Sequence, residues 1–198
     1  MTPGADVVNG SDGGDAIVAD VGNDSLNGGG GDDIFVVSAA ANLTGDTIDG
    51  GTHTTGDQIW FTSTTAAETL AVGPSITNVE QVRIVTSAGA STGTSAVNVD
   101  ASAAAAGLAI AGNDGANMLN GSAFTDTLTG NGGDDTLTGN GGGDTINGGT
   151  GDDRVEGSVG GNGTTTWDVL DGGKNFYSVQ VLGEAQARVY ILNKWEAA

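Results

Sequence analysis

The sequence repeats every nine residues without a slip from Gly112 to Glu156. The five units read GNDGANMLN, GSAFTDTLT, GNGGDDTLT, GNGGGDTIN and GGTGDDRVE, and each has Gly first, Asp or Asn sixth and one large aliphatic residue eighth. Three further units in the same register, GSDGGDAIV, ADVGNDSLN and GGGGDDIFV, cover residues 10–36. A fixed period of this kind indicates a stack of identical structural units, each of which contacts only its neighbours.

The two halves of the nonapeptide have different structural preferences. The Gly-rich first six positions can adopt the positive φ angles of a tight turn, and the last three predict a short strand. Two units then form one coil of 18 residues, so a chain of 198 residues would give about 11 coils. Successive coils stack at about 4.8 Å. Each strand buries one side chain, and these are Ile17, Leu26, Phe35, Leu119, Leu128, Leu137, Ile146 and Val155.

A stack with so small a core needs another source of stability. One buried side chain per nine residues does not offset the ordering entropy of the backbone. Stacking places the carboxylate at position six next to its counterpart 18 residues away, beside loop carbonyls that no side chain shields. Such an all-oxygen cage suits calcium, whereas magnesium demands tighter octahedral geometry. The side-chain ligands predicted from position six are Asp15, Asp24, Asp33, Asp46, Asn117, Asp126, Asp135, Asp144 and Asp153.

This nonapeptide resembles the repeat of the RTX (repeat-in-toxin) proteins. The resemblance implies an all-β fold, a right-handed parallel β-roll or β-solenoid with several calcium ions between stacked Gly-rich loops. It also implies carbonyl ligands from the first and third loop positions, which here are Gly130, Gly132, Gly139, Gly141, Gly148 and Thr150. Asn117 offers only a neutral amide oxygen, so a site that uses it should be weaker or peripheral.

Changes in composition divide the chain into four segments. Residues 1–58 form an N-terminal repeat array and residues 112–173 a C-terminal one. Between them, residues 59–111 contain few acids and alternate apolar with polar residues, which predicts calcium-poor coils of the same solenoid; a separate small β-domain is the alternative. The composition of residues 174–198 predicts a cap for the open end of the solenoid, an export signal, or both.

The insertion GGTHTTGDQIW is two residues too long for the repeat before Asp57. We expect it to bulge from the coil and to carry His53, the only histidine, into solvent without a ligand role.

Composition restricts the partners. The chain has 25 acidic and 5 basic residues and a formal net charge of −20. Repulsion at this level disfavours nucleic acid and anionic membranes, and it predicts an expanded chain when metal is absent. No cysteine is present, and no apolar run is long enough for membrane insertion.

The sequence favours a non-catalytic, extracellular role. The G-x-S-x-G pattern at residues 89–93 is not followed by a histidine, and no H-E-x-x-H motif occurs, so we expect no catalytic residues and no enzyme. The first ten residues lack the features of a secretory signal, and the resemblance implies secretion by a type I exporter. We therefore expect a calcium-folded surface-layer, matrix or adhesin protein, with self-association or a cell-surface polysaccharide as possible partners. The alternative is an accessory export and folding module of a larger RTX hydrolase, epimerase or toxin.

Overall fold

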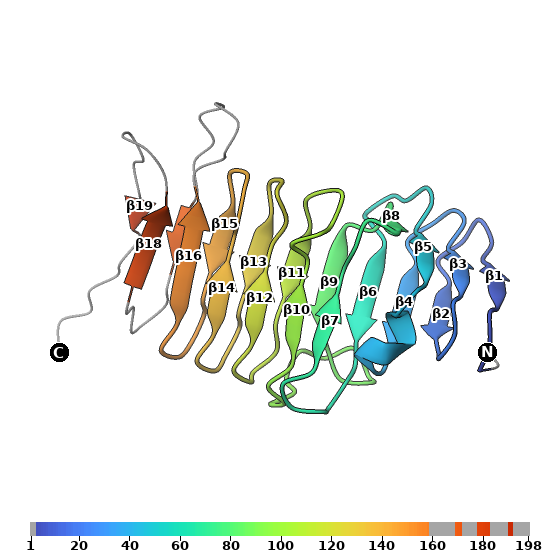
Figure 1. The fold of residues 1–198 in the computed structure, drawn as a ribbon, viewed down its shortest axis with the longest axis horizontal. Coiled ribbons are helices and arrows are strands. Elements are labelled where there is room, and N and C mark those ends of the chain that lie inside the picture. Colours follow the sequence, from blue (N-terminus) through green and yellow to red (C-terminus); the bar gives the residue numbers. More distant parts are fainter. Residues whose placement is uncertain (1–2, 159–168, 172–177, 183–189, 192–198) are drawn as a thin grey trace.

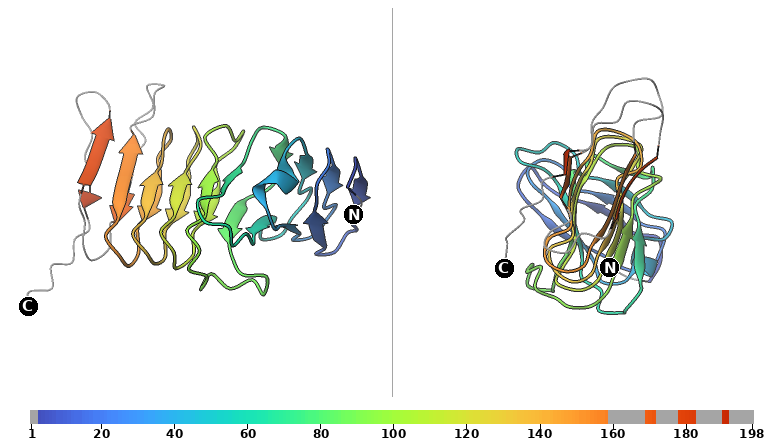
Figure 2. Two further views of the ribbon diagram at one scale, coloured as in Figure 1. Left: turned by 60° about the horizontal axis from the view of Figure 1, so that its bottom comes forward. Right: turned by 90° about the vertical axis from the view of Figure 1, so that its left-hand side faces the viewer.

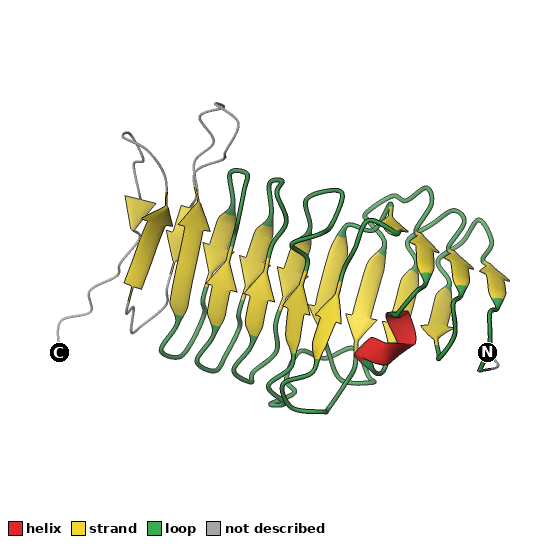
Figure 3. Ribbon diagram, in the orientation of Figure 1, coloured by secondary structure: helices red, strands yellow, loops and turns green. Residues whose placement is uncertain are grey.

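The chain winds into an elongated β-solenoid of parallel strands (Figure 1). The computed structural model describes residues 3–158, 169–171, 178–182 and 190–191, which form about eight turns. Seen along the long axis in Figure 2, the coil is flattened, with strands on its two faces and loops along its two edges. Among the described residues the only helix is the short 3-10 helix η1 (Ala40–Leu43) (Figure 3).

Every strand pair between coils is parallel, and the strands form three sheets. One face is a nine-stranded sheet of β2 (Ala16–Ala19), β4 (Ile34–Val37), β6 (Gln58–Phe61), β9 (Gln81–Ile84), β11 (Ala109–Ala111), β13 (Thr127–Thr129), β15 (Thr145–Asn147), β17 (Val169–Asp171) and β19 (Tyr190–Ile191). The other face starts with a four-stranded sheet of β1 (Val7–Asn9), β3 (Ser25–Asn27), β5 (Thr47–Asp49) and β8 (Ile76–Thr77). It continues as a six-stranded sheet of β7 (Thr69–Ala71), β10 (Asn98–Asp100), β12 (Met118–Asn120), β14 (Thr136–Thr138), β16 (Arg154–Ser158) and β18 (Ser178–Leu182).

The core is a ladder of the residues at position eight. All eight predicted side chains are buried, and they stack in register on their counterparts in the next coil, as Leu119 does on Leu137 and Leu137 on Val155. The flanking residues at positions seven and nine face outward or lie half-buried. The nonapeptide therefore supplies one core side chain per strand, as its pattern predicts.

Two of the middle strands bury two side chains each. Strand β6 buries Ile59 and Phe61, and β9 buries Val82 and Ile84, because period-two alternation places both on the inner face. Strands β6, β9 and β11 continue the nine-stranded sheet from β4 to β13. The division of the chain at residues 58, 111 and 173 stays a prediction.

The prediction of about 11 coils is wrong, because the middle coils are longer than the nonapeptide pair. Stacked residues lie 18 apart in the arrays, as Asn117 and Asp135 do, but 29 apart for Thr69 and Asn98. The extra residues lie in the loops, so the same chain length makes fewer turns. The predicted cap at residues 174–198 lies mostly outside the described residues.

Candidate calcium-binding loops

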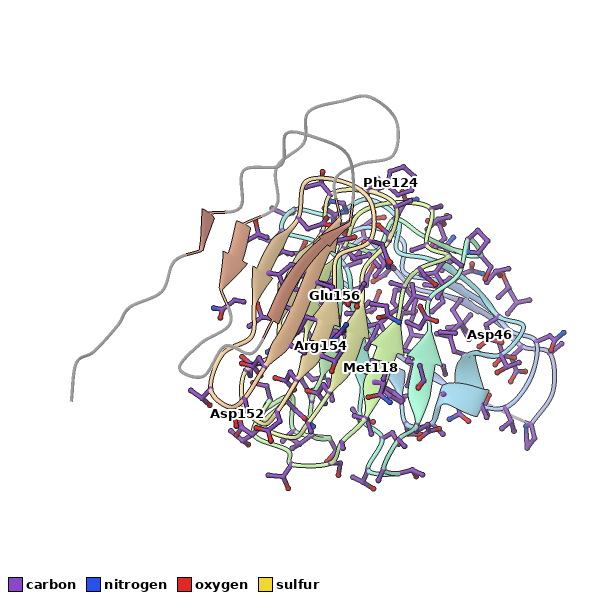
Figure 4. All side chains as sticks on the ribbon, turned by 60° about the vertical axis from the view of Figure 1, so that its left-hand side comes forward. Asp46, Met118, Phe124, Asp152, Arg154 and Glu156 are labelled. Carbon is purple, nitrogen blue, oxygen red and sulfur yellow. The ribbon has the colours of Figure 1, made fainter. Side chains whose placement is uncertain are left out.

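Loops at the two edges of the roll precede the strands and carry the residues at position six. Figure 4 separates the two edges: Phe124 lies on a loop that leads into the nine-stranded sheet, and Asp152 lies on the opposite edge. Asp15, Asp33, Asp126 and Asp144 belong to the first edge; Asp24, Asp46, Asn117, Asp135 and Asp153 belong to the second. Each edge therefore brings position six of one coil next to position six of the next.

One oxygen of each carboxylate links two coils. The Oδ1 atom accepts a hydrogen bond from the backbone N–H of position six in the preceding coil, at 2.7 to 2.9 Å. The donor and acceptor pairs are Asp6 and Asp24, Asp15 and Asp33, Asp24 and Asp46, Asp33 and Asp57, Asn117 and Asp135, Asp126 and Asp144, and Asp135 and Asp153. This ladder orients every carboxylate in the same way and leaves the second oxygen facing the loop.

The second oxygen is buried and has no hydrogen-bond partner in six of these loops, within the part of the chain that the structure describes. The six atoms are the Oδ2 atoms of Asp24, Asp33, Asp46, Asp57, Asp135 and Asp153. A buried anionic oxygen without a partner is costly, and buried charges are normally paired or bound to metal. A cation at these atoms would remove that cost.

In the loops that begin with Gly, this residue leaves the space that such a cation would need. A Cβ atom built on Gly28 would collide with Asp33 Oδ2 and with the carbonyl oxygen of Gly50 in the next coil. A Cβ on Gly130 would meet Asp135 Oδ2 and the carbonyl oxygen of Gly148 in the same way. A carboxylate oxygen and a carbonyl oxygen from adjacent coils thus converge on one small space, which is the donor chemistry that calcium prefers.

The loop backbone explains which carbonyls remain for a cation. Positions two and four adopt positive φ, as in Gly149 and Gly151, and Asn occupies this conformation at Asn131 and Asn140. The carbonyls at position two accept N–H groups from position three of the next coil, for example from Thr150 to Asn131. The candidate carbonyls at positions one and three are Gly130, Gly132, Gly139, Gly141, Gly148 and Thr150, and all lie in the loops before β14, β15 and β16.

Three predicted ligands have protein partners instead. Ser11 donates its backbone N–H and its hydroxyl to Asp15 Oδ2, at 2.7 and 2.9 Å. Ser122 does the same for Asp126 Oδ2, at 2.6 and 2.9 Å. Asn117 Oδ1 accepts the backbone N–H of Asn113 at 2.8 Å, and the Asn117 side-chain amide donates to the carbonyl oxygen of Val97 at 2.7 Å. These loops resemble capped turns more than open cages.

Two residues that resemble position six were not predicted as ligands. Asp57 is fully buried, continues the ladder from Asp33, and precedes the core residue Ile59 by two, as position six precedes position eight. That Asp-x-Ile spacing could have revealed it despite the insertion. Glu80 is the next acceptor in this ladder of hydrogen bonds, because its Oε2 accepts the backbone N–H of Asp57 at 2.8 Å. No sequence signal marks Glu80, since the step of 23 residues depends on the length of the intervening loops.

Burial also changes the acidity of these carboxyl groups. Desolvation raises the pKa of Asp135 to about 7, and the charges of Asp153 and Asp134 add to the effect. Desolvation likewise raises the pKa values of Asp46, Asp57, Asp126 and Asp153. Asp15, which is only partly buried, differs because the hydrogen bonds from Ser11 lower its pKa. The folded roll therefore disfavours its own buried charges unless a proton or a cation neutralises them.

Acid should partly replace calcium. The raised pKa values mean that the folded, metal-free roll holds protons that the unfolded chain, with Asp pKa values near 3.8, releases. Folding of metal-stripped protein should therefore become more favourable as the pH falls from about 7 toward 4, and gain nothing further below that. Circular dichroism of protein dialysed free of metal, recorded across this range, measures the effect. A β-sheet signal that does not grow between pH 7.5 and pH 4 would contradict it.

Removing the charge of Asp135 should weaken calcium-driven folding. Asp135→Asn keeps an oxygen that can accept the N–H of Asn117, but it replaces the anionic Oδ2 with a neutral amide group. We expect the calcium midpoint of folding to rise roughly tenfold, the change that a loss of about 1.4 kcal/mol produces. Asp100→Asn is the matched control, because Asp100 lies at the end of β10 outside the nonapeptides. Equal midpoints for the two variants would remove Asp135 from the ligand set.

Comparison with known proteins agrees with this geometry. The profile of the RTX calcium-binding nonapeptide repeat, which spans four copies, matches residues 2–36, 111–146 and 129–164. No curated protein and no solved structure is significantly similar to the chain. The matched segments contain the loops in which the orphaned carboxylate oxygens of Asp24, Asp33, Asp135 and Asp153 lie.

Proposed function

Because this chain is a calcium-binding repeat protein that carries the RTX nonapeptide, we propose that it is a secreted structural protein of the surface-layer, matrix or adhesin type. Calcium would fold it into a rigid rod outside the cell. The observation that carries this proposal is the continuity of the roll. The nine-stranded sheet runs from β2 to β19, about 40 Å at the usual strand spacing, with candidate calcium loops near both ends.

The charge of the protein supports an extracellular site of action. A net charge of −20 opposes compaction until cations neutralise it, and many oxygen-lined loops of one kind suit the high calcium concentrations outside cells. RTX repeats are typical of secreted proteins. No helix among the described residues has the length and apolar character to span a membrane.

The proposed role is not catalytic. The described loop that contains Ser91 runs on to β10 without a helix, so the strand–turn–helix context of a nucleophile elbow does not occur there. The buried carboxylates are committed to the ladder between coils. We propose that partners bind the outside of the rod, with a second copy of the chain or a neutral polysaccharide more compatible with the acidic surface than a polyanion.

The N-terminal end of the roll offers a route to self-assembly. Strands β1 and β2 are the terminal strands of their sheets, and each pairs on one side only within the described residues. An open edge of this kind can add another strand unless charge blocks it. Val7 on β1 is 74% exposed, and no charged side chain on β1 itself protects the edge.

Val7→Lys should therefore reduce calcium-dependent assembly without affecting the fold. Light scattering and sedimentation in millimolar calcium measure assembly, and circular dichroism checks the fold. Met118→Lys is the matched control, because Met118 is 50% exposed on β12 in the middle of the roll (Figure 4). A wild-type protein that stays monomeric in calcium at all concentrations would instead favour the role of a folding module attached to a larger protein.

A further inference from the structure

The structure brings three metal-binding side chains together where the nonapeptide repeat is interrupted. His53 lies on the inserted loop between β5 and β6, Asp57 precedes β6, and Glu80 precedes β9 in the next coil. One donor atom from each residue lies within 4.8 Å of the other two. The inserted loop carries His53 to the surface, as expected, but its ring also faces two carboxylates, which the sequence did not indicate.

The distances between the donor atoms suit a small divalent ion. His53 Nδ1 lies 3.3 Å from Glu80 Oε2 and 3.7 Å from Asp57 Oδ2. Ligands that stand about 2.0 to 2.2 Å from a tetrahedral zinc ion are separated from one another by about 3.3 to 3.6 Å. The two separations from His53 Nδ1 are close to these values, and the carboxylate oxygens of Asp57 and Glu80 lie within 4.8 Å of each other.

Asp57 supplies the independent sign that a ligand belongs here. Its side chain is completely buried, and its Oδ1 accepts the N–H of Asp33 at 2.7 Å. Its Oδ2 is buried with no hydrogen-bond partner in the described part of the chain, and it is the atom that lies 3.7 Å from His53 Nδ1. The cluster thus contains a buried anionic oxygen that no hydrogen bond from the described residues satisfies.

We propose that His53, Asp57 and Glu80 bind a borderline divalent transition metal of the zinc class. The imidazole nitrogen distinguishes this site from the all-oxygen calcium loops, because calcium prefers oxygen ligands whereas zinc accepts a mixture of imidazole and carboxylate. The side chains of His53 and Glu80 are 34% and 37% exposed, so the ion can enter from solvent and keep water as a further ligand. The ion would join two successive coils at the point where the N-terminal array ends.

The single histidine makes a direct test possible. In full-length protein saturated with calcium at pH 7.5, the imidazole C–H resonances in a proton NMR spectrum report on His53 alone. One equivalent of zinc should shift them, and isothermal titration calorimetry should detect one zinc site. His53→Gln should weaken that site roughly tenfold or more, since even indirect partners of a metal ligand contribute about 10- to 100-fold.

Two further variants separate a metal site from a surface ion pair. Glu80→Gln should weaken zinc binding, whereas Asp100→Asn, which removes the same charge outside the cluster, should not. Calcium-driven folding of each variant, followed by circular dichroism, is measured independently, so a failure here is distinguishable from a failure of the calcium proposal. Zinc that leaves the His53 resonances unchanged, or that binds His53→Gln as tightly as wild type, would overturn the proposal and leave an imidazole ring beside two carboxylates.

Discussion

Removal of calcium should abolish the β-sheet circular dichroism of this protein at neutral pH and expand the chain. Each nonapeptide buries one large apolar side chain, at position eight, which does not offset the ordering entropy of nine residues. Two further factors oppose folding: the net charge of −20, and buried Oδ2 atoms, such as those of Asp33 and Asp135, that have no hydrogen-bond partner among the described residues. Calcium would reduce the charge repulsion and bind the buried oxygens at the same time, so the folding transition should be large and cooperative.

A chelator titration followed by circular dichroism and sedimentation measures this effect. Addition of excess calcium should restore the spectrum, whereas magnesium at the same concentration should do so poorly, because it does not fit a flexible cage with many ligands. Residues 59–111 bury two side chains in strands such as β6 and β9, so any residual hydrogen-exchange protection should concentrate there. An unchanged β-sheet spectrum in chelator at pH 7.5 would show that packing alone holds the roll together.

Gly130→Ala should impair calcium-driven folding more than any conservative change on the surface. The new Cβ would collide with Asp135 Oδ2 and with the carbonyl oxygen of Gly148, the two oxygens that converge from adjacent coils. Gly130 does not have a positive φ, so the effect comes from the collision and not from backbone strain. We expect the calcium midpoint of folding to rise by about tenfold or more, which corresponds to about 1.4 kcal/mol.

Gly73→Ala is the matched control for this substitution. A Cβ at Gly73 would meet nothing within 4 Å, and the substitution should leave the calcium midpoint unchanged or slightly improved. The double variant Gly130→Ala with Asp135→Asn identifies the mechanism. If the Cβ acts by displacing the Asp135 carboxylate, the two changes should be less than additive. Full additivity, or equal midpoints for the two Gly variants, would argue against a shared cation space.

The period of nine was sufficient to predict the core and most of the candidate loops. In a solenoid the neighbours of a residue are set by the length of one coil, so a repeat of two nonapeptides already places Leu119 on Leu137 and Asp135 beside Asp153. The same local rule predicted an all-β fold with stacked parallel strands. The calcium chemistry followed from residue type, because a carboxylate at the same position of every loop needs a hard cation.

Where the repeat is irregular, only the tertiary structure shows which residues lie together. Insertions lengthen the spacing between stacked residues to 24 from Asp33 to Asp57 and to 23 from Asp57 to Glu80. The nine-residue period therefore does not reveal that these side chains stack, or that His53 faces Asp57 and Glu80. The roll has about eight turns, not 11, for the same reason. Hydrogen bonding also decided which carboxylates stay open, since Ser122 satisfies Asp126 while Asp135 Oδ2 has no partner among the described residues. Periodicity determines which residues are neighbours, but the conformation of each loop determines which of their atoms remain available to a ligand.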